Sequence, residues 1–416
     1  MNSFFLKSNN IEKSSIFWNM AGSLLMAFQS VIFLMILTRT VGLVESGIFT
    51  IAYANANLFL NIGKYGMRNY QVSDVRKEFS FSEYLTSRYL TTLCMFLVSV
   101  IYIFFTGIAN DYSPEKSQII LWMCIFKLPD AFEDVFYGDY QKKGRLDVAA
   151  KCMAIRMILT ILFFGIMIIF TRNLLISLIA STILTFALMF LLIGITYPIF
   201  KEEKKASNHV TGLLKTCFPV FLSSFLSFYI GNAPKYAIDA QLSDELQACY
   251  GFIAMPVFVI GLLNGFIFTP MILQLSCLWN DGKIKDFLRK VLRQICIVGL
   301  ITFFCLIAAH FLGIPVLSLL YNTDLSQYKT ELLILLLGGG FLGLSGVFCT
   351  VITIIRYQNA LLIGYGIVAL LALLLSNLVV RQFQIMGAAL LYLALMILLC
   401  LCFIVILFIG IKRKKM

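Results

Sequence analysis

Charged residues are scarce in this sequence: they account for only 13% of its 416 residues, and no long polar stretch separates its apolar runs. A soluble globular domain carries about a quarter charged residues, so this scarcity excludes an ordinary soluble domain. Hydrophobic residues make up 60% of the chain, and the mean hydropathy is +0.91. The chain is therefore predicted to be a polytopic membrane protein. Its short connecting segments leave no room for a soluble catalytic domain.

Histidine occurs only twice, as His209 and His310, and the eleven cysteines form no CxxC motif or Cys/His cluster. Most of these cysteines lie within apolar runs, where a thiol acts as a small hydrophobic group. We therefore predict no metal site, no disulfide and no catalytic histidine. A net charge of +12 without a basic face and interleaved aromatic residues also gives no reason to expect nucleic-acid binding.

Apolar runs of about 20 residues, the length that crosses a bilayer, recur along the whole chain and predict about twelve helices. The predicted spans are 15–38, 46–66, 87–108, 117–140, 149–170, 174–199, 213–233, 246–276, 288–311, 329–354, 360–380 and 385–411. The fold class is thus all-α. The basic segment 201–209 divides the helices into two sets, which predicts a lobe over residues 1–205 and another over 206–416. The two sets share faint internal similarity, which is typical of parallel repeats with a substrate path between them.

Most of the 33 lysines and arginines fall in every second connecting segment, starting with the N-terminal one. Cytoplasmic segments of membrane proteins are enriched in Lys and Arg. This pattern predicts that both termini are cytoplasmic. Arg88 and Arg156 are counted among these inner residues.

The predicted fourth helix carries charges that a lipid-facing helix would not tolerate. At about 100° per residue, Lys127, Asp130, Glu133 and Asp134 fall in one band about 120° wide. Each ionised group near the bilayer centre costs about 2.5–3.5 kcal/mol. The band must therefore face other helices or a water-filled cavity.

Three carboxylates against one lysine leave this helix with an excess of negative charge. One interpretation is a purely structural buried network, neutralised by Lys127 and Lys64. The other is that Asp130, Glu133 and Asp134 bind Na⁺ or a proton and couple transport to an ion gradient.

Further polar residues form candidate contacts for a substrate in such a cavity. The second helix carries Asn57, Asn61, Lys64 and Arg68 on one face, a stripe that we predict faces the fourth helix across the cavity. Hydrogen bonding between helices and snorkelling of the two cations are the structural alternatives. The complete candidate set is Asn19, Arg39, Asn57, Asn61, Lys64, Arg68, Lys127 and Lys235. Lys235 is placed just beyond the seventh helix, at the outer face.

Two stretches in the first 90 residues carry a family resemblance. They are Ser15-Ile16-Phe17-Trp18-Asn19 with Arg39-Thr40-Val41-Gly42, and Gly63-Lys64-Tyr65-Gly66-Met67-Arg68 with Asn69-Tyr70-Gln71-Val72-Ser73-Asp74. These resemble the N-terminal lobe of bacterial Wzx-type polysaccharide flippases. Those proteins belong to the multidrug/oligosaccharidyl-lipid/polysaccharide exporter superfamily.

The resemblance implies a MATE-like fold of two six-helix lobes around a cationic cavity, in the bacterial plasma membrane. It implies a lipid-linked oligosaccharide cargo on undecaprenyl pyrophosphate, carried from the inner to the outer leaflet for capsule or O-antigen assembly. Membrane lipids and polysaccharide polymerase or assembly proteins would be the partners. No cofactor beyond Na⁺ or H⁺ coupling is expected.

Two alternative functions stay open at this point. A cation-coupled multidrug exporter would share the fold, although a basic cavity suits its cationic cargoes poorly. A membrane-embedded polysaccharide polymerase or acyltransferase would be an enzyme, but the large external loop or catalytic His/Asp motif of such enzymes is missing. We therefore expect no enzymatic activity.

Overall fold

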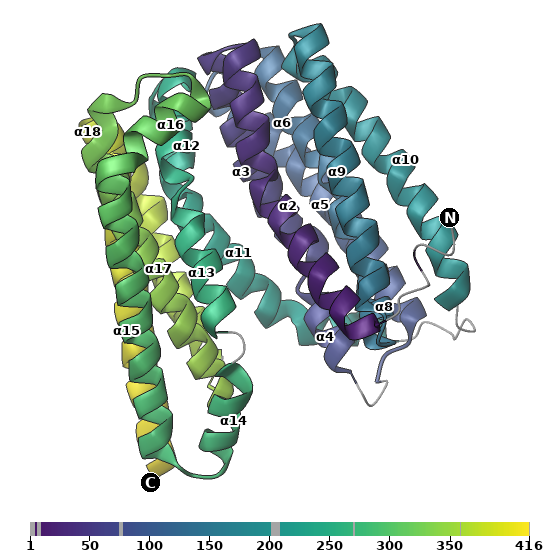
Figure 1. The fold of residues 1–416 in the computed structure, drawn as a ribbon, viewed down its shortest axis with the longest axis vertical. Coiled ribbons are helices and arrows are strands. Elements are labelled where there is room, and N and C mark those ends of the chain that lie inside the picture. The colour runs from purple at the N-terminus through teal and green to yellow at the C-terminus, as the bar shows by residue number, and fades with distance from the viewer. Residues whose placement is uncertain are drawn as a thin grey trace. The chain divides into compact units, whose positions relative to one another are not determined.

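The computed structural model describes residues 5, 10–74, 78–200, 209–268, 271–357 and 359–415, and every regular element within these ranges is a helix (Figure 1). The chain forms two compact units, Met1–Phe225 and Leu226–Met416. The boundary between the units falls inside one long helix, α11 (Val210–Gln241). The boundary predicted from the basic segment lies at residues 205 and 206, which are outside the described residues.

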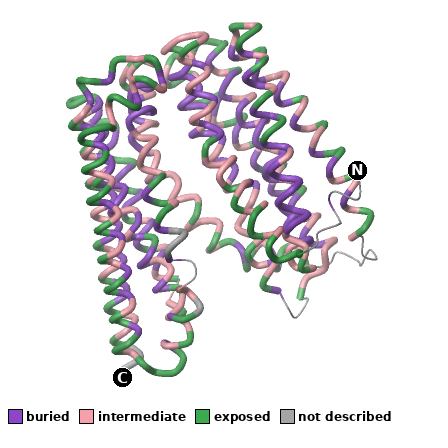
Figure 2. Tube along the Cα trace, viewed as in Figure 1, coloured by how far each residue is buried: buried purple, intermediate pink, exposed green. Residues whose placement is uncertain are grey.

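Among the described residues of the first unit, nine helices precede α11, and most of them match the predicted spans. They are α2 (Ile11–Thr40), α3 (Leu43–Lys64), α4 (Met67–Ser73), α5 (Phe81–Ala109), α6 (Pro114–Phe126), α7 (Leu128–Phe132), α8 (Asp134–Lys142), α9 (Leu146–Thr171) and α10 (Leu174–Phe200). Helix α3 is the most completely buried of the long apolar helices, and it packs against α2, α5 and α6. Figure 2 shows buried positions running along the inner helices.

The second unit contains the rest of α11 and the remaining helices. They are α12 (Asp244–Ala254), α13 (Val257–Phe268), α14 (Ile272–Asn280), α15 (Ile284–Ala308), η2 (Ala309–Gly313), α16 (Ile314–Tyr321), η3 (Ser326–Tyr328), α17 (Lys329–Ile354) and α18 (Asn359–Lys415). Its core forms where α17 packs against α13, α15 and α18. Within α18 the backbone departs from helical geometry at Gln384, where φ is 50°, so this assigned helix consists of two helices joined at a kink.

Ten of the described helical segments are long and apolar enough to cross a membrane. The predicted span 117–140 is not among them, because it is charged and is divided into α6, α7 and α8. The last two predicted spans both lie within α18, on either side of the kink. The prediction of an all-α polytopic membrane protein is confirmed, with the count of about twelve as an approximation.

Local sequence signals explain where several of these helices begin. Ser80 accepts a hydrogen bond from the backbone of Glu83, whose carboxylate accepts one from the Ser80 N–H, so α5 starts with a complete capping box. The Ser113 hydroxyl caps α6 by accepting a hydrogen bond from the Lys116 N–H, and it is followed by Pro114, whose fixed φ suits the first helical position. These caps satisfy N–H groups that no helical carbonyl can reach.

The predicted fourth helix is not continuous, as we had expected it to be. It breaks at Lys127 and again at Glu133. Pro129 explains the first break, because its ring lacks an N–H and clashes with the carbonyl four residues earlier. Asp130 therefore lies on the short helix α7, between the break at Lys127 and the break at Glu133.

The predicted end of the seventh helix at residue 233 is wrong. Helix α11 continues through Pro234 and Lys235 to Gln241. A proline in a membrane helix can bend it without ending it, because neighbouring groups satisfy the freed carbonyl. Lys235 therefore lies inside a helix of the second unit and is partly buried.

Large apolar side chains are exposed along the outer helices of both units. Examples are Phe104 and Phe105 on α5, and Phe303 and Phe304 on α15, each more than half exposed. A water-soluble monomer rarely exposes continuous apolar surface on this scale, whereas a bilayer accommodates it. These helices are thus suited to contact lipid.

A tight turn between α3 and α4 packs against the first part of α11 within the first unit. Tyr65 and Gly66 both adopt left-handed backbone conformations, with φ of 52° and 65°. The Tyr65 ring stacks on Phe221 with the ring centroids 4.5 Å apart. A Cβ added to Gly66 would lie 2.7 Å from Cγ1 of Val220, so only glycine fits both the backbone and the close approach of α11.

Gly66→Ala is expected to lower the stability of the first unit by about 1–2 kcal/mol through the left-handed backbone, with the clash against Val220 adding to this. Gly194→Ala is the matched control, because a Cβ there would meet no atom within 4 Å in the middle of α10. The control is expected to be neutral or to stabilise by up to about 1 kcal/mol. Melting followed by fluorescence-detected size-exclusion chromatography compares them. Equal melting temperatures would contradict the prediction.

Candidate functional site: a buried charged network

The charged band of the fourth segment faces the interior of the first unit. Lys127, Asp130, Glu133 and Asp134 are 1%, 8%, 3% and 6% exposed. Their partners come from α2, α3, α4, α5 and α9, which surround the broken segment. The low exposure of these four side chains agrees with the prediction that the band turns away from lipid. The band contacts other helices directly.

Arg156 of α9 bridges two of the carboxylates. Its Nη2 lies 2.5 Å from Oδ1 of Asp130, and its Nε lies 3.1 Å from Oε1 of Glu133, to which Nη2 also donates. The Arg156 side chain is only 2% exposed. Charge-assisted hydrogen bonds of this kind are about twice as strong as neutral ones. They fix α9 to the short helix α7 and the turn that follows it.

Lys127 links the same network to α2 and α3. Its Nζ lies 3.1 Å from Oδ2 of Asp130 and 2.8 Å from Oε1 of Gln29, which is buried on α2. The ammonium also stands 4.8 Å from the centre of the Tyr53 ring on α3, a favourable cation–π arrangement. Lys127 is therefore fully engaged within the protein.

Asp134 receives the remaining two cations. Nη2 of Arg88 lies 3.0 Å from one carboxylate oxygen, and Nη1 of Arg68 lies 3.4 Å from the other. Arg88 has no exposed surface and also donates to the Gly63 carbonyl at 2.5 Å. Arg68 is 29% exposed and donates to Gln141 at 3.0 Å. Arg68, the last residue of the predicted stripe, thus contacts the fourth segment directly, from α4.

Arg88 and Arg156 change the balance of charge that the sequence suggested. Both were assigned to inner segments, but they lie inside α5 and α9 and are fully buried. With Lys127, they supply one cation for each of the three carboxylates. The network therefore needs no bound cation for neutrality. An arginine ten residues inside an apolar helix, as Arg156 is, was the signal that could have identified this role.

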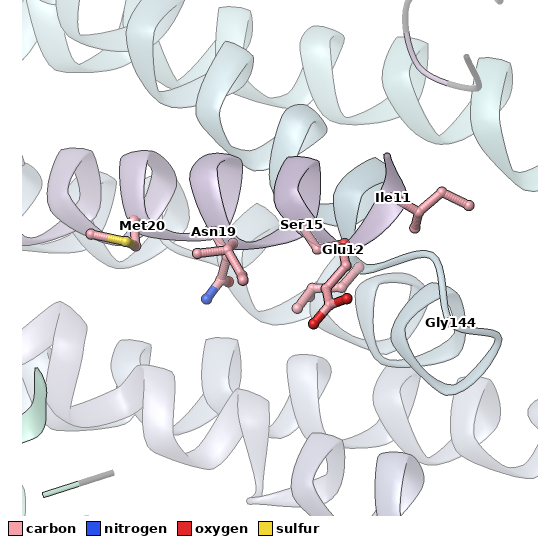
Figure 3. A pocket seen from close by; sticks show the side chains of 8 residues that line it. Ile11, Glu12, Ser15, Asn19, Met20 and Gly144 are labelled. Carbon is pink, nitrogen blue, oxygen red and sulfur yellow. The ribbon is translucent and has the colours of Figure 1, made fainter. Parts of the chain in front are cut away.

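The other candidate residues are more scattered. The Asn57 and Asn61 amides donate to carbonyls of their own helix, at Tyr53 and Asn57. Lys64 is partly exposed and has no hydrogen-bond or ion-pair partner among the described residues. Arg39 is exposed at the end of α2. Asn19 lines a pocket near the start of that helix (Figure 3).

A second group of charges lies beside this network, where α4 and α8 end. Asp74 accepts hydrogen bonds from the backbone N–H groups of Glu78 and Phe79, and Lys142 lies 3.4 Å away. Burial alone would raise the pKa of Asp74, but these donors and the ammonium outweigh it and hold the pKa below its usual value. Asp74 therefore stays ionised and ties the end of α4 to α8.

Neither a metal centre nor a disulfide is apparent in the part of the chain that the structure describes. No three His, Cys, Asp or Glu side chains gather there in a way that could hold a metal ion. All eleven cysteines are free. The distinguishing feature of the first unit is its ion-pair network.

The comparison with protein families decides the identity. Residues 13–276 match the model of a family described as "Polysaccharide biosynthesis protein". The chain belongs to this family. The resemblance to polysaccharide flippases of the exporter superfamily is thereby confirmed.

The chain is also similar in sequence to a curated protein and in fold to two solved structures. The chain is 28% identical over 285 residues to the "Capsular polysaccharide biosynthesis protein CapF" of Staphylococcus aureus, covering 65% of this chain and 69% of that protein. Its fold is similar to that of the "Lipid II flippase MurJ, inward closed conformation", with a TM-score of 0.71 and 17% identity over 95% of this chain and 86% of the other.

The fold is also similar to the inward-facing conformation of "a multidrug resistance MATE family transporter of the MOP superfamily". The TM-score is 0.67 and the identity 13%, with 94% of each chain covered. At such low identity the structural likeness concerns the fold alone. The MATE-like fold is confirmed.

Proposed function

We propose that this family member is a flippase for undecaprenyl-pyrophosphate-linked oligosaccharide repeat units. It carries them from the inner to the outer leaflet of a bacterial plasma membrane, by alternating access, during assembly of a cell-surface polysaccharide. The observation that carries the proposal is a polysaccharide-biosynthesis family match on a chain with a transporter fold. The distribution of basic residues supports a cytoplasmic location for both termini. Polymerase and assembly proteins would receive the flipped cargo.

The available polar groups suit the two parts of such a cargo. A pyrophosphate requires cations. Lys64 is partly exposed and forms no hydrogen bond or direct ion pair with a described residue, although its charge acts on nearby Asp130, and Arg68 is also partly exposed. Sugars require amides and hydroxyls, and the polyprenyl tail can remain in the bilayer. We assign Lys64 and Arg68 to the pyrophosphate.

Coupling to Na⁺ or H⁺ through Asp130, Glu133 and Asp134 remains part of the proposal. These carboxylates are held by Lys127, Arg88 and Arg156, so an incoming Na⁺ or proton must replace an existing ion pair. Such a replacement would loosen α7 from α9. Coupling would then act through the packing of the first unit.

A cation-coupled multidrug exporter is the rival function, favoured by the likeness to the multidrug transporter fold. Purified protein in proteoliposomes separates the two. With an undecaprenyl-pyrophosphoryl oligosaccharide inside and a glycan-specific probe outside, we expect protein-dependent exposure of the glycan, and imposed Na⁺ or H⁺ gradients then test coupling. Movement of a cationic dye without any exposure of glycan would support the exporter instead.

Lys64→Ala is expected to weaken cargo binding about tenfold or more, because a hydrogen bond to a charged group contributes about 1.5–3 kcal/mol. Lys64→Arg, which keeps the charge, should recover part of the loss. Lys215→Ala, an exposed lysine of α11, is the control and should bind as the unmodified protein does. Titration of nanodisc-embedded protein with the lipid-linked oligosaccharide measures this. Unchanged binding by Lys64→Ala would remove Lys64 from the site.

A further inference from the structure

A pocket of about 570 Å³ opens beside the first three turns of α2, where the turn between α8 and α9 approaches it (Figure 3). Its volume falls within the range of about 300–1,000 Å³ that is typical of small-ligand sites. Polar groups come from Glu12, Ser15 and Asn19, and apolar surface comes from Ile16 and Met20. All of these residues belong to the first unit.

The three polar side chains share one face of α2, since they are spaced three and four residues apart. None of them makes a hydrogen bond or ion pair with another described residue. In Figure 3 the Glu12 carboxylate and the Asn19 amide extend from the same side of the helix. The presence of Glu12 alone has a structural explanation, because a carboxylate in the first turn of a helix interacts favourably with the helix dipole. That reason does not apply to Ser15 or Asn19.

The chemistry of this set indicates what it would bind. A carboxylate, an amide and a hydroxyl together accept and donate hydrogen bonds, as the hydroxyl groups of a sugar require. The aliphatic side chains of Ile16 and Met20 can cover the apolar C–H face of a sugar ring. The negative charge of Glu12 opposes a phosphate at the same place. The pocket therefore suits the glycan part of the cargo and not its pyrophosphate.

We propose that Glu12, Ser15 and Asn19 form a glycan subsite that holds the first sugars of the cargo on the cytoplasmic side. This inference rests on the proposed flippase function and deepens it. The pyrophosphate is assigned to Lys64 and Arg68, so that sugar and phosphate are recognised by different helices. Selectivity for the sugar then resides in the first turns of α2.

Two ligands that differ only in the sugar test the subsite. Binding of undecaprenyl pyrophosphate and of undecaprenyl-pyrophosphoryl N-acetylglucosamine is measured on the full chain in nanodiscs. We expect the sugar to tighten binding at least tenfold in the unmodified protein. In the Glu12→Gln/Asn19→Ala double variant this gain should be lost, while affinity for the bare pyrophosphate stays the same. Lys13→Gln, an exposed neighbour on α2 outside the pocket, should keep the gain.

Other outcomes overturn the inference in distinguishable ways. If the sugar does not tighten binding in the unmodified protein, or if the double variant keeps the gain, the subsite is wrong. An equal loss for both ligands would show that the variant acts on the pyrophosphate and would overturn it too. These results leave the flippase function standing as long as the proteoliposome assay exposes glycan. Absence of exposure in that assay refutes the function, and the subsite with it.

Discussion

Replacing Arg156 by methionine is expected to lower the stability of the first unit by about 3–5 kcal/mol. The reason is that Arg156 is the only described cation that contacts Glu133, and it shares Asp130 with Lys127. Without it, one buried carboxylate loses its countercharge and the other keeps only a lysine. The loss corresponds to a melting temperature lower by roughly 10 °C for a unit of this size.

Two further variants show whether the uncompensated charge is the cause. Adding Glu133→Gln to Arg156→Met removes the orphaned carboxylate and should restore a large part of the melting temperature. Arg289→Ala is the control, because its side chain is 83% exposed and lies 3.7 Å from Asp286. Exposed pairs contribute about 0–1 kcal/mol, so the control should melt almost normally. If Glu133→Gln gives no recovery, lost packing and not charge explains the effect.

Arg88→Leu is the second variant with a large expected effect, again about 3–5 kcal/mol. It removes the closer of the two partners of Asp134 and a donor to the Gly63 carbonyl, deep between α3 and α5. Arg68→Ala provides a matched comparison, since Arg68 contacts the same carboxylate but is partly exposed. Its loss should cost about 1 kcal/mol or less, because water screens a partly exposed pair.

Melting curves of the two variants, recorded in the same detergent, show whether the stability lost with each arginine depends on how deeply its ion pair is buried. A much lower melting temperature for Arg88→Leu than for Arg68→Ala is the expected result. Adding Asp134→Asn to Arg88→Leu should recover stability, because a neutral amide is less costly to bury than an unpaired carboxylate. A reversed order would mean that the exposed contact, and not the buried one, holds Asp134.

The sequence by itself determined the membrane class, most of the helical spans and the burial of the charged band. Apolar run length and helical spacing are local properties, and the cost of placing Asp130 or Glu133 against lipid does not depend on which helix covers them. The motifs around Gly63 and Arg68 also sufficed to indicate the family that the comparison then confirmed.

Only the tertiary structure decided how that band is neutralised. Arg156 follows Glu133 by 23 residues and Arg88 precedes Asp134 by 46, so neither pair has a spacing that a single helix could reveal. The packing of α5 and α9 around α7 brings these side chains together. This arrangement is stable because each buried carboxylate then has a countercharge, whereas an unpaired buried charge would be strongly destabilising. The gathering of Glu12, Ser15 and Asn19 beside the turn between α8 and α9 was likewise fixed by packing, since one wall of that pocket comes from a distant part of the chain.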